Sequence, residues 1–160
     1  MKTCSFTGHR RIAPSHEKRL RELLFRAVNY AYDNGCRRFI TGGALGFDTL
    51  AAREVIKFRI SHSDVSLVLA LPCVNQDEHW SEEQRGAYSY TLSMADEVIY
   101  ISEEYTDTCM KERNLYLATE ADILIAYASR YASGAGQTVR MAKELGKQVY
   151  NLYAALSEGE

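Results

Sequence analysis

The sequence predicts an α/β fold in which helices cover both faces of a doubly wound, mostly parallel sheet of about six strands. Two observations support this prediction. Short apolar runs, typical of strands that are buried on both faces, recur along the 160 residues. Longer segments with helical spacing separate these runs, and helices of this kind are the usual crossover connections between parallel strands.

Six apolar runs have the length of strands rather than of helices. They extend over residues 3–7, 38–41, 65–71, 98–101, 123–127 and 148–152. In the common strand order 3-2-1-4-5-6, the second and fifth strands would lie about 14 Å apart. A nucleotide-sized molecule could bridge that distance.

The segments between the strands carry apolar stripes of helical period. The clear stripes occupy residues 20–31, 47–58, 110–121 and 139–145, and a weaker one occupies residues 81–94. Ser81 and Gln84 have the spacing of a capping box. Ser15, which follows a proline, is expected to cap the first helix, and Gly35 and Gly146 are expected to end helices in the left-handed conformation.

Length and composition indicate one domain over residues 1–160 in a soluble, cytoplasmic protein. With a net charge of −2, the chain lacks the long-range positive potential of a protein that binds duplex DNA, so we expect no duplex-DNA partner. The longest apolar run, residues 67–74, is far shorter than the roughly 20 residues of a membrane helix, and no signal peptide is visible. The four cysteines are more than thirty residues apart, which suits neither a disulfide framework nor a zinc ribbon.

Three glycine-containing turns follow strands that end at the same edge of the predicted sheet. They occupy residues 7–10, 41–48 and 133–138. Glycine permits close backbone approach, and a helix N-terminus behind it attracts phosphate. Ordinary turn geometry is the alternative explanation. The backbone and side chains expected to bind a ligand here are those of Gly8, His9, Gly42, Gly43, Gly46, Gly134, Gly136, Gln137 and Thr138.

Four further side chains near this edge are candidates for ligand contacts. Arg10 could hold a phosphate bidentately, or it could be a solvated surface residue. Asp48 could cap its helix or accept a hydrogen bond from a ribose hydroxyl. Arg113 and Asn114 lie in the early turns of a helix that begins at the same edge, and Asn114 interrupts an apolar stripe, which requires a partner for its amide.

Several catalytic and cofactor motifs are absent from the sequence. There is no phosphate-binding loop of the G-x-x-x-x-G-K-[ST] type, and no G-x-G-x-x-G follows the first strand. There is also no G-x-S-x-G elbow, and the four histidines are scattered. We therefore predict no metal site, no catalytic residue and no certain cofactor.

In this order and combination, the residues resemble the YpsA-like branch of the SLOG superfamily, which is related to Lonely Guy enzymes and to DprA. The resemblance covers nearly the whole chain and is carried by residues 7–10, 42–48, 105–114, 122–127 and 134–138. It implies a three-layer Rossmann-like domain, similar in fold to molybdenum-cofactor carrier proteins. It also implies a homo-oligomer and a nucleotide-derived small-molecule ligand such as ADP-ribose or NAD. Our first hypothesis is that the chain is a sensor or carrier of such a ligand.

The chain departs from the Lonely Guy enzymes, which cleave the N-glycosidic bond of nucleoside monophosphates. Two acidic positions of their glycine-rich motif are occupied here by Arg140 and Met141. We therefore expect binding without catalysis, and we expect Gly43→Asp and Arg113→Ala to weaken binding in a folded protein. The alternatives are hydrolysis of an N-glycosidic or pyrophosphate bond through Asp48 or Glu104, and, less favoured, DprA-like binding of single-stranded nucleic acid.

Overall fold

The computed structural model describes residues 2–129 and 133–157, and their strands form one sheet in the order β4-β3-β2-β1-β5-β6. All five neighbouring pairs are parallel. The predicted α/β class is confirmed. The strands are β1 (Lys2–Gly8), β2 (Cys36–Thr41), β3 (Ser66–Cys73), β4 (Glu97–Ser102), β5 (Ile123–Tyr127) and β6 (Gln148–Asn151).

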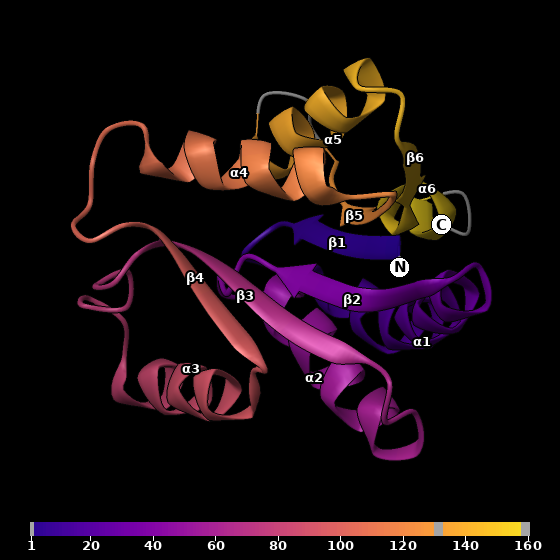
Figure 1. Cartoon of the computed structure of the whole chain (residues 1–160), viewed down its shortest axis with the longest axis horizontal. Helices are drawn as coiled ribbons and strands as arrows, with labels where there is room; N and C mark the ends of the chain where they lie inside the picture. The colour runs from indigo at the N-terminus through magenta and orange to yellow at the C-terminus, as the bar shows by residue number, and fades with distance from the viewer. Residues whose placement is uncertain (1, 130–132, 158–160) are drawn as a thin grey trace.

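The helices cover both faces of the sheet, as Figure 1 shows. One face carries α1, α2 and α3, the other carries α4 and α5, and α6 packs against α1 and β5. The direction of winding reverses after β4, because β5 pairs with β1 on the side away from β2. The helices are α1 (Glu17–Asp33), α2 (Phe47–Ser61), α3 (Glu82–Met94), α4 (Cys109–Glu120), α5 (Gly134–Glu144) and α6 (Leu152–Ser157), with a short 3-10 helix at Pro14–His16.

Alternate side chains of the central strands enter the two different cores. Ile123, Ile125 and Tyr127 of β5 belong to the core beneath α1, α2 and α6. Leu124 and Ala126 belong to the core beneath α4 and α5. Because successive residues of a strand point to opposite faces, a strand covered on both faces is apolar throughout, which explains the continuous runs in the sequence.

The strand order differs from the 3-2-1-4-5-6 order used to estimate distances from the sequence. Strand β1 lies directly between β2 and β5. The ends of β2 and β5 are therefore two strand spacings apart, about 10 Å, rather than about 14 Å. Helix α4 makes the long return from the β4 edge and contacts β3 and β1 on the way, so it crosses over the end of β2.

The helix ends agree with those predicted from the sequence except at the start of α1, and one helix, α6, was not predicted. The capping box is confirmed, since the amide of Gln84 donates to Ser81 Oγ (3.1 Å) and the amide of Ser81 donates to Gln84 Oε1 (3.0 Å). The prediction that Ser15 caps α1 is wrong, because Ser15 lies within the 3-10 turn and His16 precedes the helix. Helix α6 was not predicted. The signal for it is Asn151, whose Oδ1 accepts from the amide of Tyr153 (3.2 Å).

Both glycines expected to end helices have positive φ, +100° at Gly35 and +75° at Gly146, as predicted. No helix within the described residues has the length and apolar character needed to cross a membrane.

Candidate functional site

A cavity of about 410 Å³ lies at the carboxyl edge of the sheet, where the chain leaves the neighbouring strands β1 and β5. We call it the switch-point pocket, because the winding direction of the sheet reverses there and ligands of open α/β sheets bind at such points. Its volume lies within the range of about 300–1,000 Å³ that is typical of ligand sites. Of the predicted residues, it brings together Gly8, His9, Arg10, Asp48, Arg113, Asn114, Gly134 and Gln137.

The first turn of α5 contributes backbone donors to the switch-point pocket. Ser133 caps this helix: its Oγ accepts from the amide of Gly136 (3.0 Å) and its carbonyl from the amide of Gln137 (2.8 Å). Gly134 and Ala135 line the pocket, and no acceptor for their amides occurs among the described residues. Two N–H groups and the positive end of the helix are thus available to an anion.

Arg113 places a buried cation on the pocket wall. Its side chain is 5% exposed, Nη1 donates to the carbonyl of Gly42 (2.6 Å), and Nε donates to Asn114 Oδ1 (3.0 Å). None of the ion pairs between described residues includes Arg113. Burial lowers the pKa of this guanidinium, whereas the nearby Asp48 carboxylate acts in the opposite direction. The same bonds give the Asn114 amide the partner that its position on an apolar stripe requires.

Asp48 is a buried carboxylate with one committed and one uncommitted oxygen. Its Oδ2 accepts from the amide of Ala44 (3.2 Å), and its Oδ1 has no hydrogen-bond partner in the described part of the chain. Burial raises the pKa of Asp48 to about 6, against the attraction of Arg113. The prediction that Asp48 caps its helix is wrong, because Gly46 is the N-cap of α2 and no side chain of the described residues caps that end. Asp48 Oδ2 instead stabilises the β2–α2 turn through the amide of Ala44. The contact with a ribose hydroxyl stays a prediction.

The β2–α2 turn offers fewer backbone donors than the sequence suggested. The amide of Gly43 donates to Thr41 Oγ1 (3.2 Å), and that of Phe47 donates to the carbonyl of His9 (3.1 Å). The space beside Gly42 is filled by the side chains of Arg113 and Asp48. Gly43 and Gly46 line a separate cavity beside α3 rather than the switch-point pocket.

The Gly43→Asp variant is now expected to unfold more easily, contrary to the expectation of an intact fold. Gly43 has a φ of +67°, and a Cβ added there would overlap Leu71 Cδ2 in the core. We expect a loss of about 2–4 kcal/mol in the free energy of unfolding, measured by urea denaturation. Gly86→Asp is the control, because the space around Gly86 on α3 is open. Equal stability of both variants would contradict this prediction.

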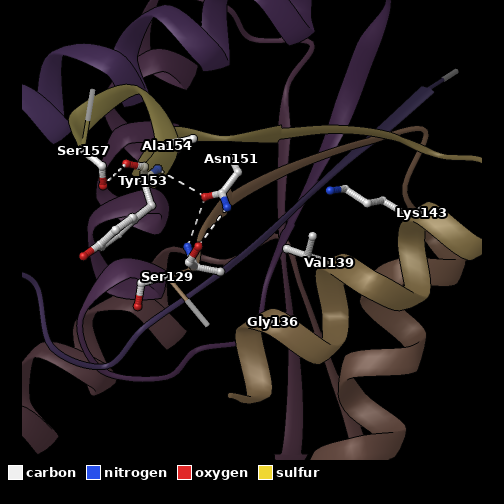
Figure 2. A pocket seen from close by; sticks show the side chains of 9 residues that line it. Ser129, Gly136, Val139, Lys143, Asn151, Tyr153, Ala154 and Ser157 are labelled. Carbon is white, nitrogen blue, oxygen red and sulfur yellow. Dashed lines mark hydrogen bonds between the residues drawn. The ribbon is translucent and has the colours of Figure 1, made fainter. Parts of the chain in front are cut away.

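The two remaining predicted residues on α5 lie outside the switch-point pocket. Gly136 lines a cavity between α5 and the ends of β5 and β6, shown in Figure 2. The central side chain there, Asn151, donates to the carbonyl of Ala128 (2.8 Å) and accepts from its amide (3.2 Å), so its amide group is committed to the protein. Thr138 is fully buried, and its hydroxyl donates to the carbonyl of Gly134 (3.0 Å), which makes it a structural residue of the helix start.

Residues that sequence reasoning missed complete the pocket. Lys111 and Asp107 line it and bring one charge of each sign. Lys111 could have been predicted from its position, because it lies in the first turn of α4, two residues before Arg113 and three before Asn114. Arg140 is exposed on α5, and Glu104 is exposed beyond β4; neither lines the pocket. Among the described residues, no group of three or more His, Cys, Asp or Glu could hold a metal ion.

Comparison with protein families gives a match over residues 13–155 to the YpsA model, described as the YspA SLOG family. The SPbeta prophage-derived protein YoqJ of Bacillus subtilis is 32% identical over 130 residues, which are 72% of this chain and 76% of YoqJ. A UPF0398 protein of Bacillus cereus strain G9842 is 27% identical over 141 residues, which are 86% of this chain and 77% of that protein.

Solved structures share the fold at low sequence identity. DNA processing protein A of Helicobacter pylori, described for its single-stranded DNA binding mode, superposes with a TM-score of 0.65 at 17% identity over 92% of this chain. DprA of Streptococcus pneumoniae gives 0.65 at 16% identity over 94%, and TM1055 gives 0.57 at 17% over 93%. This chain spans 63% and 50% of the two DprA chains and 72% of the TM1055 chain.

Proposed function

This chain belongs to the YpsA family of the SLOG superfamily, and we propose that its switch-point pocket binds the phosphate-bearing part of a nucleotide-derived small molecule such as ADP-ribose or NAD. Membership of this family supports a nucleotide- or nucleic-acid-binding role. In the proposed role the protein is a sensor or carrier, which binds the ligand without cleaving it.

The proposal rests on a buried guanidinium that forms no ion pair with any described residue and that lines the same cavity as two helix N–H groups without acceptors among those residues. Arg113 is held in place by the carbonyl of Gly42, which prevents it from folding away into solvent. The amides of Gly134 and Ala135 line the same pocket. Charge-assisted hydrogen bonds to phosphate from a fixed guanidinium and from a helix N-terminus reinforce one another.

Exposed cations add to this anion site. Arg10 follows the end of β1, Lys111 lies in the first turn of α4, and both line the pocket with Arg113. Three positive side chains therefore face two negative ones, Asp48 and Asp107. The excess is modest, which suits a ligand with one or two phosphates and a neutral sugar.

Thermal unfolding with a small ligand panel tests the proposal. We expect ADP-ribose, NAD and AMP to raise the melting temperature, by about 8 °C at a concentration 100 times the Kd, where binding contributes about 2.7 kcal/mol. Ribose 5-phosphate should also raise it, because it carries the anion and the sugar hydroxyls. No shift with any phosphate-bearing compound would contradict the proposal.

A hydrolase is the second candidate, and Asp48 is the observation that favours it. A carboxyl group with a pKa of about 6, buried in the pocket and with one free oxygen, is suited to proton transfer near neutral pH. Glu104, the other carboxylate considered, does not line the pocket. Chromatography of AMP, NAD and ADP-ribose after incubation with the protein distinguishes the candidates, because released base or ribose phosphate identifies an enzyme and intact ligand a binding protein.

Single-stranded DNA is a further candidate partner, suggested by the fold shared with DNA processing protein A. Binding of an oligonucleotide would weaken steeply with salt, whereas binding of a mononucleotide would not. A titration with a short oligonucleotide at low and moderate salt therefore separates this candidate from the small-molecule ligand.

A further inference from the structure

A second cavity of about 290 Å³ lies between α1, α2 and α3, and it shares the Asp48 wall with the switch-point pocket. We call it the Trp80 cavity. The β2–α2 turn contributes Gly43, Leu45 and Gly46 to its lining, and α3 contributes Ala87 and Tyr88. Nothing in the anion site described above explains this cavity.

The Trp80 cavity has an aromatic wall. The half-buried ring of Trp80 meets the ring of Tyr88 edge to face, with centroids 5.1 Å apart and an angle of 67°. Trp80 also packs against the main core, so its position is set by the fold. A large flat side chain at the opening of a cavity is a stacking surface for another planar ring.

The Trp80 cavity also collects unpaired buried polar atoms. Within the described residues, three buried side-chain polar atoms have no hydrogen-bond partner: Ser5 Oγ, Asp48 Oδ1 and Tyr88 Oη. The last two belong to walls of this one cavity. The amide of Gln76 lies near the Tyr88 hydroxyl but donates to the carbonyl of Gly43 (3.1 Å). Buried polar atoms in proteins are usually hydrogen-bonded, so two oxygens without partners among the described residues are candidates for hydrogen bonds with a ligand.

We infer that the Trp80 cavity binds a nucleobase-like heteroaromatic ring that carries N–H donors. The ring stacks on Trp80, an N–H on its edge donates to Asp48 Oδ1, and the Tyr88 hydroxyl pairs with a neighbouring polar atom of the ring. The cavity is smaller than typical sites for drug-sized ligands, which suits a single base or nucleoside. The inference is independent of the proposed anion site, because no phosphate contact enters it.

The fluorescence of Trp80 tests this inference directly, because the chain contains one tryptophan. We would titrate the full chain with adenosine and guanosine, exciting at the red edge of tryptophan absorption where nucleosides absorb little. Both should quench Trp80 to a saturating value. Purine riboside, which has the ring but no N–H donor on it, should bind at least fivefold more weakly, and ribose 5-phosphate should not quench.

The Tyr88→Phe variant provides the decisive comparison. It keeps the ring and the reporter but removes a hydroxyl that has no hydrogen-bond partner among residues 2–129 and 133–157, so the melting temperature should be unchanged or higher. Affinity for guanosine should fall about fivefold, the effect of one lost hydrogen bond. Ala87→Phe, which places a ring inside the cavity, should abolish saturable quenching, and Ser89→Phe, on the same helix but outside the lining of this cavity, should not.

Two results would overturn the inference: quenching by nucleosides that never saturates, or equal binding of purine riboside and guanosine. Failure of the anion site is seen separately, as the absence of a melting shift with ribose 5-phosphate. A single-stranded oligonucleotide serves as a further arm. Tighter, salt-sensitive quenching by the oligonucleotide identifies a strand as the source of the base, and equal affinity identifies a free nucleoside; either supports the ring site.

Discussion

Replacement of Gly134 by Asp is expected to weaken the binding of phosphate-bearing ligands by about 100-fold in a protein that remains folded. Gly134 lines the switch-point pocket at the first position of α5. If the carboxylate and a singly charged phosphate are about 5 Å apart, the repulsion at an effective dielectric constant near 20 is about 3 kcal/mol, which corresponds to roughly 100-fold in affinity. Isothermal titration with ADP-ribose, or with whichever phosphate compound shifts the melting temperature, measures the effect.

The same substitution should leave the fold intact. The affinity for phosphate should fall, whereas the stability of the protein should stay the same or rise. A Cβ at Gly134 would meet only Asn114 Nδ2, at an ordinary 3.6 Å. A negative side chain in the first helical turn also stabilises a helix, by about 0.3–1 kcal/mol. Gly134→Asn is the matched control, since it has the same shape without the charge and should lose much less affinity. Equal losses for Asp and Asn would show that no anion binds at this helix end.

Replacement of Asp48 by Asn is expected to stabilise the protein at pH 7.5 by about 2–3 kcal/mol. Burial raises the pKa of Asp48 from 3.8 to about 6. Between these values the folded protein holds a proton that the unfolded chain has released, so the stability of the wild type falls as the pH rises and levels off above 6. The difference between 3.8 and 6 corresponds to about 3 kcal/mol. The asparagine variant has no such ionisation, and its amide oxygen can still accept from the amide of Ala44.

Urea unfolding of both proteins from pH 3.5 to 8 measures this effect. The difference between the two curves isolates Asp48 from the other titrating groups. It should be near zero at the acid end, where wild-type Asp48 is protonated in both states, and complete above pH 6. The Asp48→Asn substitution should also impair nucleoside quenching of Trp80, because an N–H then stands in place of the accepting oxygen. A difference that does not vary with pH would mean that the carboxylate is solvated and normal.

Such a gain in stability would be informative about function. A buried carboxylate with an unpaired oxygen costs free energy, and proteins retain such groups mainly where a ligand or a reaction uses them. A stable Asp48→Asn variant that no longer binds nucleosides would therefore identify Asp48 as a functional residue. A stable variant with unchanged binding would assign it a role in the β2–α2 turn alone.

Chain connectivity brought several of the predicted residues to one edge of the sheet, whereas the competition of side chains for the same backbone groups could not be predicted from the sequence. Gly8, Arg10 and Gly134 follow strands β1 and β5, and parallel strands necessarily end at one edge of the sheet. The turn after β2 also lies at this edge, but its N–H groups are already hydrogen-bonded within the protein. The amide of Gly43 donates to Thr41 Oγ1, and the amide of Ala44 donates to Asp48 Oδ2. Glycine spacing contains no information about this internal pairing.

The sequence by itself determined the α/β class and, within the described residues, the six strands and five of the six α-helices, because these depend on local periodicity and on which faces are buried. The tertiary structure decided the strand order and therefore which turns share a cavity. The path of α4 brings Arg113 to Gly42, 71 residues earlier in the chain. The packing of α2 and α3 puts Asp48 and Tyr88 in the lining of one cavity, and neither Asp48 Oδ1 nor Tyr88 Oη has a hydrogen-bond partner among the described residues. Such long-range placement results from the packing of whole elements, which no local pattern specifies.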